Sequence, residues 1–116
     1  MATPQDILRG AAQLLREKGW TTHAFARLDN SFVVPWDYPH ACRFCLSGAV
    51  QRAASDLHTS QEAASVAVGR VVISRGYLRG TVRFNDEQAR SVDDVIAIID
   101  EAIAWLDAVD AATADA

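Results

Sequence analysis

No hydrophobic run in this sequence is long enough to cross a membrane, and only two of its 116 residues are cysteine. A membrane-spanning helix needs about 20 consecutive apolar residues. The segment Met1–Asp6 lacks the basic start and the apolar centre of a signal peptide, so we do not expect export. These absences predict a cytoplasmic protein without a membrane partner, in which both thiols are reduced.

Lysine is also scarce, because Lys18 stands alone beside ten arginines, and the net charge is −4. An acidic balance argues against nucleic acid as the main partner. The charges are unevenly placed: five arginines lie between residues 70 and 90, whereas seven acidic residues and no basic residue follow Arg90. We expect these two groups to attract each other, within one chain or across a dimer.

Half of the residues are hydrophobic, which supplies material for a core without disulfides or metal. A chain of this length fits one domain, and no internal repeat or linker divides it. We therefore expect a single globular domain over residues 1–109. Residues 110–116 are expected to form a frayed C-terminal tail.

Two helices are strongly indicated near the ends of the chain. Thr3 can cap a helix that begins at Pro4, and Gly19 is placed to end it. Near the other end, Ser91 and Asp94 have the spacing of a capping box. The helix that follows carries an apolar stripe formed by Val92, Val95, Ile96, Ile99, Ala102, Ile103 and Leu106.

Three more apolar residues of this last helix, Ile98, Trp105 and Val109, lie beside the stripe. They widen the apolar arc to about half of the helix surface, beyond the ~100° of an ordinary surface helix. One packed face does not need this width. The extra apolar surface is either buried by the hairpin or is an oligomer contact, and we predict that Ile98, Trp105 and Val109 form an interface between copies of the chain.

The middle of the chain is predicted to contain two further helices. One is expected over His40–Ala54, with small residues on one face, and the next from a capping box at residues 59–62 to about Ser74. The β-prone run Val71–Ile73 favours a strand as the competing interpretation. Thr81–Phe84 is predicted to be a short strand.

A small hairpin is expected between the first two helices. Segments 24–28 and 31–34 flank Asp29 and Asn30, two residues that tolerate a tight turn. The predicted fold is therefore a compact α+β domain, mainly α, with four helices and one β-hairpin.

Cys42 and Cys45 form a C-x-x-C pair for which three interpretations compete. The first is thioredoxin-like redox chemistry, in which a helix N-terminus lowers a thiol pKa. The second is a zinc site completed by His40 and His58, although structural zinc sites generally use two such pairs. The third is two small thiols packed on the buried face of the second helix. We favour the third and expect no metal and no cofactor.

Catalysis by a cysteine needs a base and an orienting group near the thiol. Cys45, one of the three histidines, and Asn85 or Asp86 supply these residue types. Cys45, Asn85 and Asp86 are therefore the candidate catalytic residues. The structural alternative for Asn85 and Asp86 is a turn before the last helix, with both side chains bonded to nearby backbone amides, and we favour it.

The sequence also resembles an uncharacterised family of small bacterial and phage domains. The resemblance lies in Arg43–Ala49 (RFCLSGA), Arg83–Asp86 (RFND) and Ser91 at the start of the last helix. The pattern of that family is a tryptophan, an Ala-Arg segment, C-x-x-G-A, W-N-D and a Ser- or Thr-capped helix. Trp20 and Ala26–Arg27 are similar to its early part.

The resemblance extends from about Trp20 to Ala104, with Phe84 in place of the family's tryptophan and Cys42 in place of an ordinary apolar residue. It implies no particular activity, but it marks Cys45, Gly48 and the pair Asn85–Asp86. We expect the Cys45 face of the second helix to pack against Asn85–Asp86, with Gly48 allowing the close approach.

These features together predict a non-enzymatic protein-interaction module that forms a homo-oligomer through its last helix. The alternative is a small thiol-dependent enzyme or redox protein centred on Cys45, with Cys42 as the resolving partner.

Overall fold

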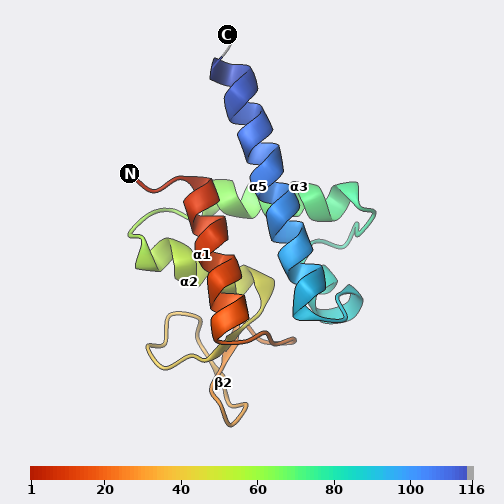
Figure 1. Ribbon diagram of the computed structural model, residues 1–116. Helices are drawn as coiled ribbons and strands as arrows, with labels where there is room; N and C mark the ends of the chain where they lie inside the picture. The colour runs from red at the N-terminus through yellow and green to blue at the C-terminus, as the bar shows by residue number, and fades with distance from the viewer. Residues whose placement is uncertain (115–116) are drawn as a thin grey trace.

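Two helices from opposite ends of the chain, α1 (Pro4–Glu17) and α5 (Val92–Ala114), pack against each other in the computed structural model, which describes residues 1–114 (Figure 1). Helix α2 (Leu46–Asp56) packs on α1, and α3 (Glu62–Ser74) packs on α5. The C-terminal half of α5 extends beyond the other helices (Figure 1).

Helix α1 begins and ends where the sequence predicts. The Thr3 hydroxyl accepts a hydrogen bond from the Asp6 N–H, and the Asp6 carboxylate accepts one from the Thr3 N–H, which completes a capping box. Gly19 follows the helix with φ +139°, a conformation that favours glycine. The face that α1 buries consists of Gln5, Ile7, Leu8, Ala11, Ala12 and Leu15.

Helix α5 buries most of the predicted stripe, together with Ile98. Asp94 lies in its first turn and accepts a hydrogen bond from the Arg90 N–H. The helix continues to Ala114, whereas residues 115 and 116 of the expected tail lie outside the described residues. In the projecting half, Asp107 and Asp110 both accept hydrogen bonds from the Gln5 amide, which joins the first helix to the last.

A three-stranded antiparallel sheet replaces the predicted hairpin. β1 (Ala26–Arg27) is its central strand, paired with β2 (Val33–Val34) on one side and β3 (Arg43–Phe44) on the other. Each strand has only two residues, so sequence alternation could not reveal β3. The backbone of Trp20 adds an isolated bridge to Phe44.

The second helix begins six residues later than predicted. Its expected first part contains β3, and Cys45 is the N-cap of α2 rather than a residue within it. Hydrogen bonds to Ala26 and its neighbours hold residues 42–45 in extended form, because the Cys45 N–H donates to the Phe25 carbonyl and the Cys42 N–H to the Arg27 carbonyl. Tertiary pairing thus overrides the helical periodicity of this segment.

Helix α3 ends at Ser74 as predicted, and the competing strand at Val71–Ile73 is not formed. The predicted capping box is also not formed, because Gln61 is the N-cap and makes no side-chain cap hydrogen bond. Instead, the Ser60 hydroxyl accepts a hydrogen bond from the Glu62 N–H.

The predicted strand at Thr81–Phe84 is helical. Gly80, with φ +96°, leads into the single turn α4 (Thr81–Arg83), which continues as the π-helical turn η1 (Phe84–Gln88). Phe84 is buried and packs against the Tyr77 ring, 4.9 Å away between centroids. Residues 1–114 therefore contain five α-helices, not four, and none of them is long and apolar enough to cross a membrane.

Candidate functional site

Cys45, Asn85 and Asp86 lie at one pocket, although Cys45 precedes Asn85 by 40 positions in the sequence. The pocket is bounded by the start of α2, the β1–β2 region and the α4–η1 segment. Its volume is about 640 Å³, within the usual range for small-molecule sites. Its walls are mostly apolar and include Phe25, Val33, Val34, Pro35 and Val82.

Asn85 joins three parts of the chain at the base of this pocket. Its Oδ1 accepts hydrogen bonds from Trp20 Nε1 (2.8 Å) and from the Leu46 N–H (3.0 Å). Its Nδ2 donates to the Thr21 carbonyl (3.1 Å) and to Asp86 Oδ1 (2.9 Å). The side chain is 1% exposed, and these four bonds use its full hydrogen-bonding capacity.

Asp86 holds the loop that carries His23. Its Oδ1 accepts a second hydrogen bond from the His23 N–H (2.8 Å), and His23 has a left-handed backbone with φ +62°. Asp86 Oδ2 lies 3.8 Å from His23 Nδ1, beyond hydrogen-bonding distance. The Asp86 side chain is 15% exposed and the His23 side chain 67%, so the carboxylate lies inside the pocket and the imidazole at its mouth.

The Cys45 thiol serves as the cap of α2. Its Sγ accepts a hydrogen bond from the Gly48 N–H (3.2 Å), and the residue is 5% exposed. Burial raises the pKa of Cys45, the Gly48 hydrogen bond opposes that shift, and the negative charge of Asp86 adds to it. The thiol is therefore protonated at neutral pH, unlike an activated nucleophile.

Gly48 has a different neighbour from the one predicted. Asn85 does contact the start of α2 through the Leu46 N–H, and Asp86 lines the same pocket as Cys45. The close approach at Gly48, however, is to the Phe25 backbone. A Cβ at residue 48 would overlap the Phe25 carbonyl oxygen and lie 2.9 Å from the carbonyl carbon. Glycine is required here by space, and it allows α2 to lie directly against the residue before β1.

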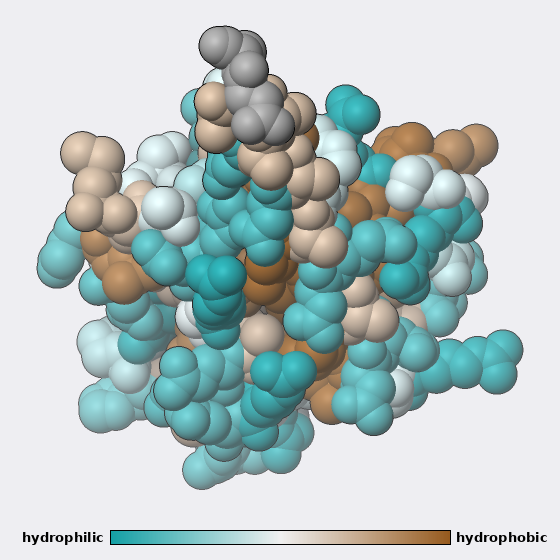
Figure 2. Space-filling model, turned by 45° about the horizontal axis from the view of Figure 1, so that its top comes forward, coloured by the Kyte–Doolittle hydropathy of each residue, from teal (hydrophilic) through white to brown (hydrophobic). Residues whose placement is uncertain are grey.

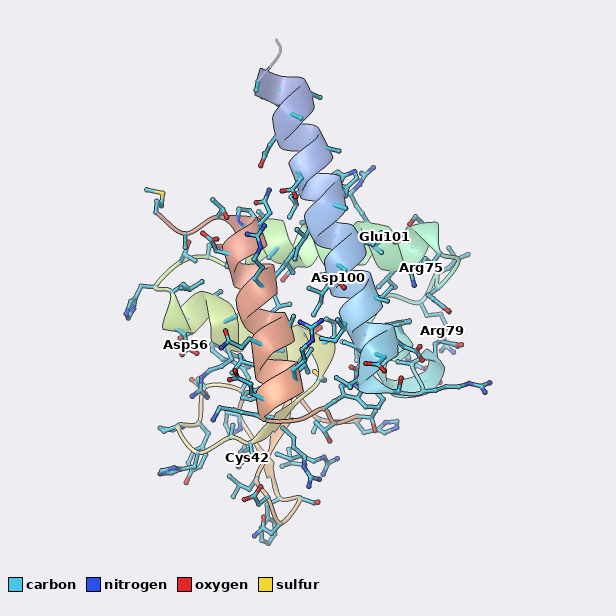
Figure 3. All side chains as sticks on the ribbon, viewed as in Figure 1. Cys42, Asp56, Arg75, Arg79, Asp100 and Glu101 are labelled. Atoms are coloured by element: carbon cyan, nitrogen blue, oxygen red, sulfur yellow. The ribbon has the colours of Figure 1, made fainter. Side chains whose placement is uncertain are left out.

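The two cysteines do not share a site, and neither lies within a helix. Cys42, labelled in Figure 3, is half-buried and donates a hydrogen bond to the His40 carbonyl. It lines a different surface depression, together with Lys18. The prediction that both pack on the buried face of the second helix is therefore wrong. Among residues 1–114, no group of three or more His, Cys, Asp or Glu side chains is placed to hold a metal ion.

The predicted interface residues of α5 lie in different environments. Ile98 is fully buried inside the chain, so only Trp105 and Val109 offer surface. The Arg70 guanidinium lies over the Trp105 ring, 4.9 Å from its centroid. Among residues 1–114, the expected attraction between arginines and acids occurs at one point, where Arg75 of α3 pairs with Glu101 of α5 at 3.2 Å (Figure 3).

The sequence does not indicate that the loop between α1 and β1 forms part of the site, although His23 in that loop is one of the three histidines considered as a base for Cys45. Trp20, Thr21 and His23 all bond to Asn85 or Asp86. The family resemblance marks Trp20 as part of the pattern. Nothing in the sequence indicates its hydrogen bond to Asn85, which lies 65 residues further along the chain. The left-handed conformation of His23 had no local signature.

The fold and the site define a small α+β domain in which a hydrogen-bonded Asn-Asp pair lies at the base of an apolar pocket. The chain belongs to a family of unknown function (DUF6197), whose family model matches residues 1–104. The expected resemblance to a family of this kind is thus confirmed, and the matched range includes the entire pocket. Searches of curated proteins and of solved structures found no match.

Proposed function

We propose that the protein is a non-enzymatic binding domain that takes an apolar ligand into the pocket at Cys45, Asn85 and Asp86. The observation that carries this proposal is the contrast between the walls and the base of the pocket. The walls expose apolar side chains to solvent, whereas the hydrogen bonds of Asn85 at the base are satisfied within the chain. Such a base shapes a binding site without supplying a reactive group.

The state of Cys45 supports binding over thiol chemistry. A nucleophilic cysteine needs a lowered pKa and a base within reach of its sulfur. Burial instead raises the pKa of Cys45, and its sulfur accepts a hydrogen bond from the Gly48 N–H in the first turn of α2. Cys42, its suggested resolving partner, lines another depression. The thiol-enzyme alternative therefore has less support than the binding domain.

A neutral fluorescent dye tests the binding proposal. We expect Nile red to gain fluorescence with the wild-type protein, and Val82→Asp to weaken its binding about tenfold, because a charge then lies in the apolar wall. Val82 is half exposed, so the substitution leaves the core intact. The control is Leu78→Asp, at a more exposed residue that does not line this pocket. Equal dye binding by Val82→Asp and wild type contradicts the proposal.

Self-association through α5 is the second candidate, and one observation favours it. The projecting half of α5 leaves Val109 exposed beside the half-buried Trp105. Figure 2 shows an apolar strip between hydrophilic side chains on the face where the C-terminal end of the helix comes forward. Both residues lie beyond the range matched by the family model, so this contact is proposed for this chain and not for the family.

Sedimentation equilibrium tests self-association. We expect the wild type to be a dimer at high micromolar concentration and Val109→Glu to be a monomer, because the dimer contact would bury an unpaired charge. Ala111→Glu is the control, since Ala111 is exposed on another side of the same helix. A monomeric wild type, or a dimer that survives Val109→Glu, excludes this interface.

A further inference from the structure

We infer that the pocket binds a small organic cation, an amine or amidine with an apolar body, and that Asp86 accepts hydrogen bonds from its nitrogen. This inference rests on the proposed binding function and names the class of ligand. It starts from the unequal use of the two Asp86 oxygens. Oδ1 accepts hydrogen bonds from the His23 N–H and from Asn85 Nδ2, whereas Oδ2 accepts none from residues 1–114.

Among the described residues that line the pocket, Asp86 has no permanently charged partner. No lysine or arginine lines it, and the other polar groups at the base are the neutral Asn85 amide and the protonated Cys45 thiol. The arginine nearest in sequence, Arg83, pairs with Glu87 at 3.0 Å instead. His23 is mostly solvent-exposed and its Nδ1 is 3.8 Å from Oδ2. A mostly buried carboxylate that has no lysine or arginine partner favours a cationic hydrogen-bond donor as its ligand.

The shape of the pocket indicates the rest of the ligand. Phe25, Val33 and Val82 offer apolar surface around the carboxylate, and all three are exposed to solvent. A ligand whose ring or chain covers these side chains while its nitrogen reaches Oδ2 removes apolar surface from water and partners the charge. The volume of about 640 Å³ is that of a small-molecule site, so we assign a small molecule as the occupant.

Three probes that share one ring and differ in their polar end test this inference: benzylamine, benzyl alcohol and benzoate. The readouts are the NMR signals of the Trp20 indole N–H and the His23 backbone N–H, which donate to Asn85 Oδ1 and Asp86 Oδ1. We expect benzylamine to bind about tenfold more tightly than benzyl alcohol, because its hydrogen bond to Asp86 is charge-assisted. Benzoate is expected to bind most weakly.

Asp86→Asn is the decisive variant, because its Oδ1 keeps an acceptor for the His23 N–H but its side chain has no charge. We expect it to bind benzylamine and benzyl alcohol equally. Glu87→Gln is the matched control, since it removes a neighbouring carboxylate that does not line the pocket, and should keep the tenfold preference.

The outcomes separate the two proposals. If benzyl alcohol moves both NMR signals of the wild type as readily as benzylamine does, the cation inference is overturned and the binding function stands. If no probe moves either signal, the binding function fails and the inference fails with it. The comparison of probes on the wild type does not depend on how well Asp86→Asn folds.

Discussion

Gly48→Ala is expected to reduce the free energy of unfolding by about 3 kcal/mol, at the upper end of the cost of overpacking. The added methyl group would overlap the Phe25 carbonyl, which is backbone and cannot rotate away. The same carbonyl accepts a hydrogen bond from the Cys45 N–H at 3.1 Å, so moving it also strains the start of α2. Urea denaturation measures the change.

Gly69→Ala is the matched control for Gly48→Ala. Gly69 also lies within a helix, α3, but an added Cβ there meets no atom within 4 Å. Alanine is the better helix former, so this variant should be more stable than the wild type by about 0.5–1 kcal/mol. Opposite signs for the two substitutions are the expected result. A Gly48→Ala protein as stable as the wild type would show that α2 and the Phe25 backbone are not in close contact.

Asn85→Ala is expected to lower the free energy of unfolding by about 3–5 kcal/mol, because it leaves one buried and two half-buried polar groups without partners. The Trp20 indole N–H and the Leu46 N–H both lose their acceptor, and the Thr21 carbonyl loses a donor. Each unsatisfied buried group costs about 1–3 kcal/mol. The wavelength of Trp fluorescence during urea denaturation follows the transition.

Asn30→Ala serves as the control for Asn85→Ala. Asn30 is exposed, and its side chain accepts one hydrogen bond, from the Phe32 N–H. Its removal should cost less than about 1 kcal/mol, because water can replace the lost partner. If the two asparagine substitutions have equal effects, Asn85 does not hold the pocket together as described.

The parts of the fold that were predictable are those set by neighbours in the sequence. The Thr3 cap, the stop at Gly19 and the burial of Val95 and Ile99 on α5 all follow from local spacing. Helical periodicity does not predict the structure of residues 40–45, because backbone hydrogen bonds to Phe25 and Arg27 hold residues 42–45 extended. No local pattern contains such distant pairing.

The candidate site was predictable as a set of residues but not in its organisation. The sequence motifs point to Cys45, Asn85 and Asp86, yet the expected turn at residues 85–86 is a π-helical turn whose side chains form hydrogen bonds with the loop after α1. The role of Cys45 also differs, since it caps α2 and does not fill space within it. A π turn and a cysteine cap have weak sequence signals, so only the folded chain reveals them.

The pairing of α1 with α5 places a constraint on how the chain matures during synthesis. The apolar face of α1 is made first, but its main partners include the last helix, and the Gln5 amide bonds to Asp107 and Asp110, over 100 residues away. A nascent chain emerging from the ribosome therefore carries part of the apolar face of α1 uncovered until α5 has been synthesised. Contacts of such long sequence separation slow folding. Until α5 packs on α1, the incompletely folded chain exposes apolar surface that chaperones bind.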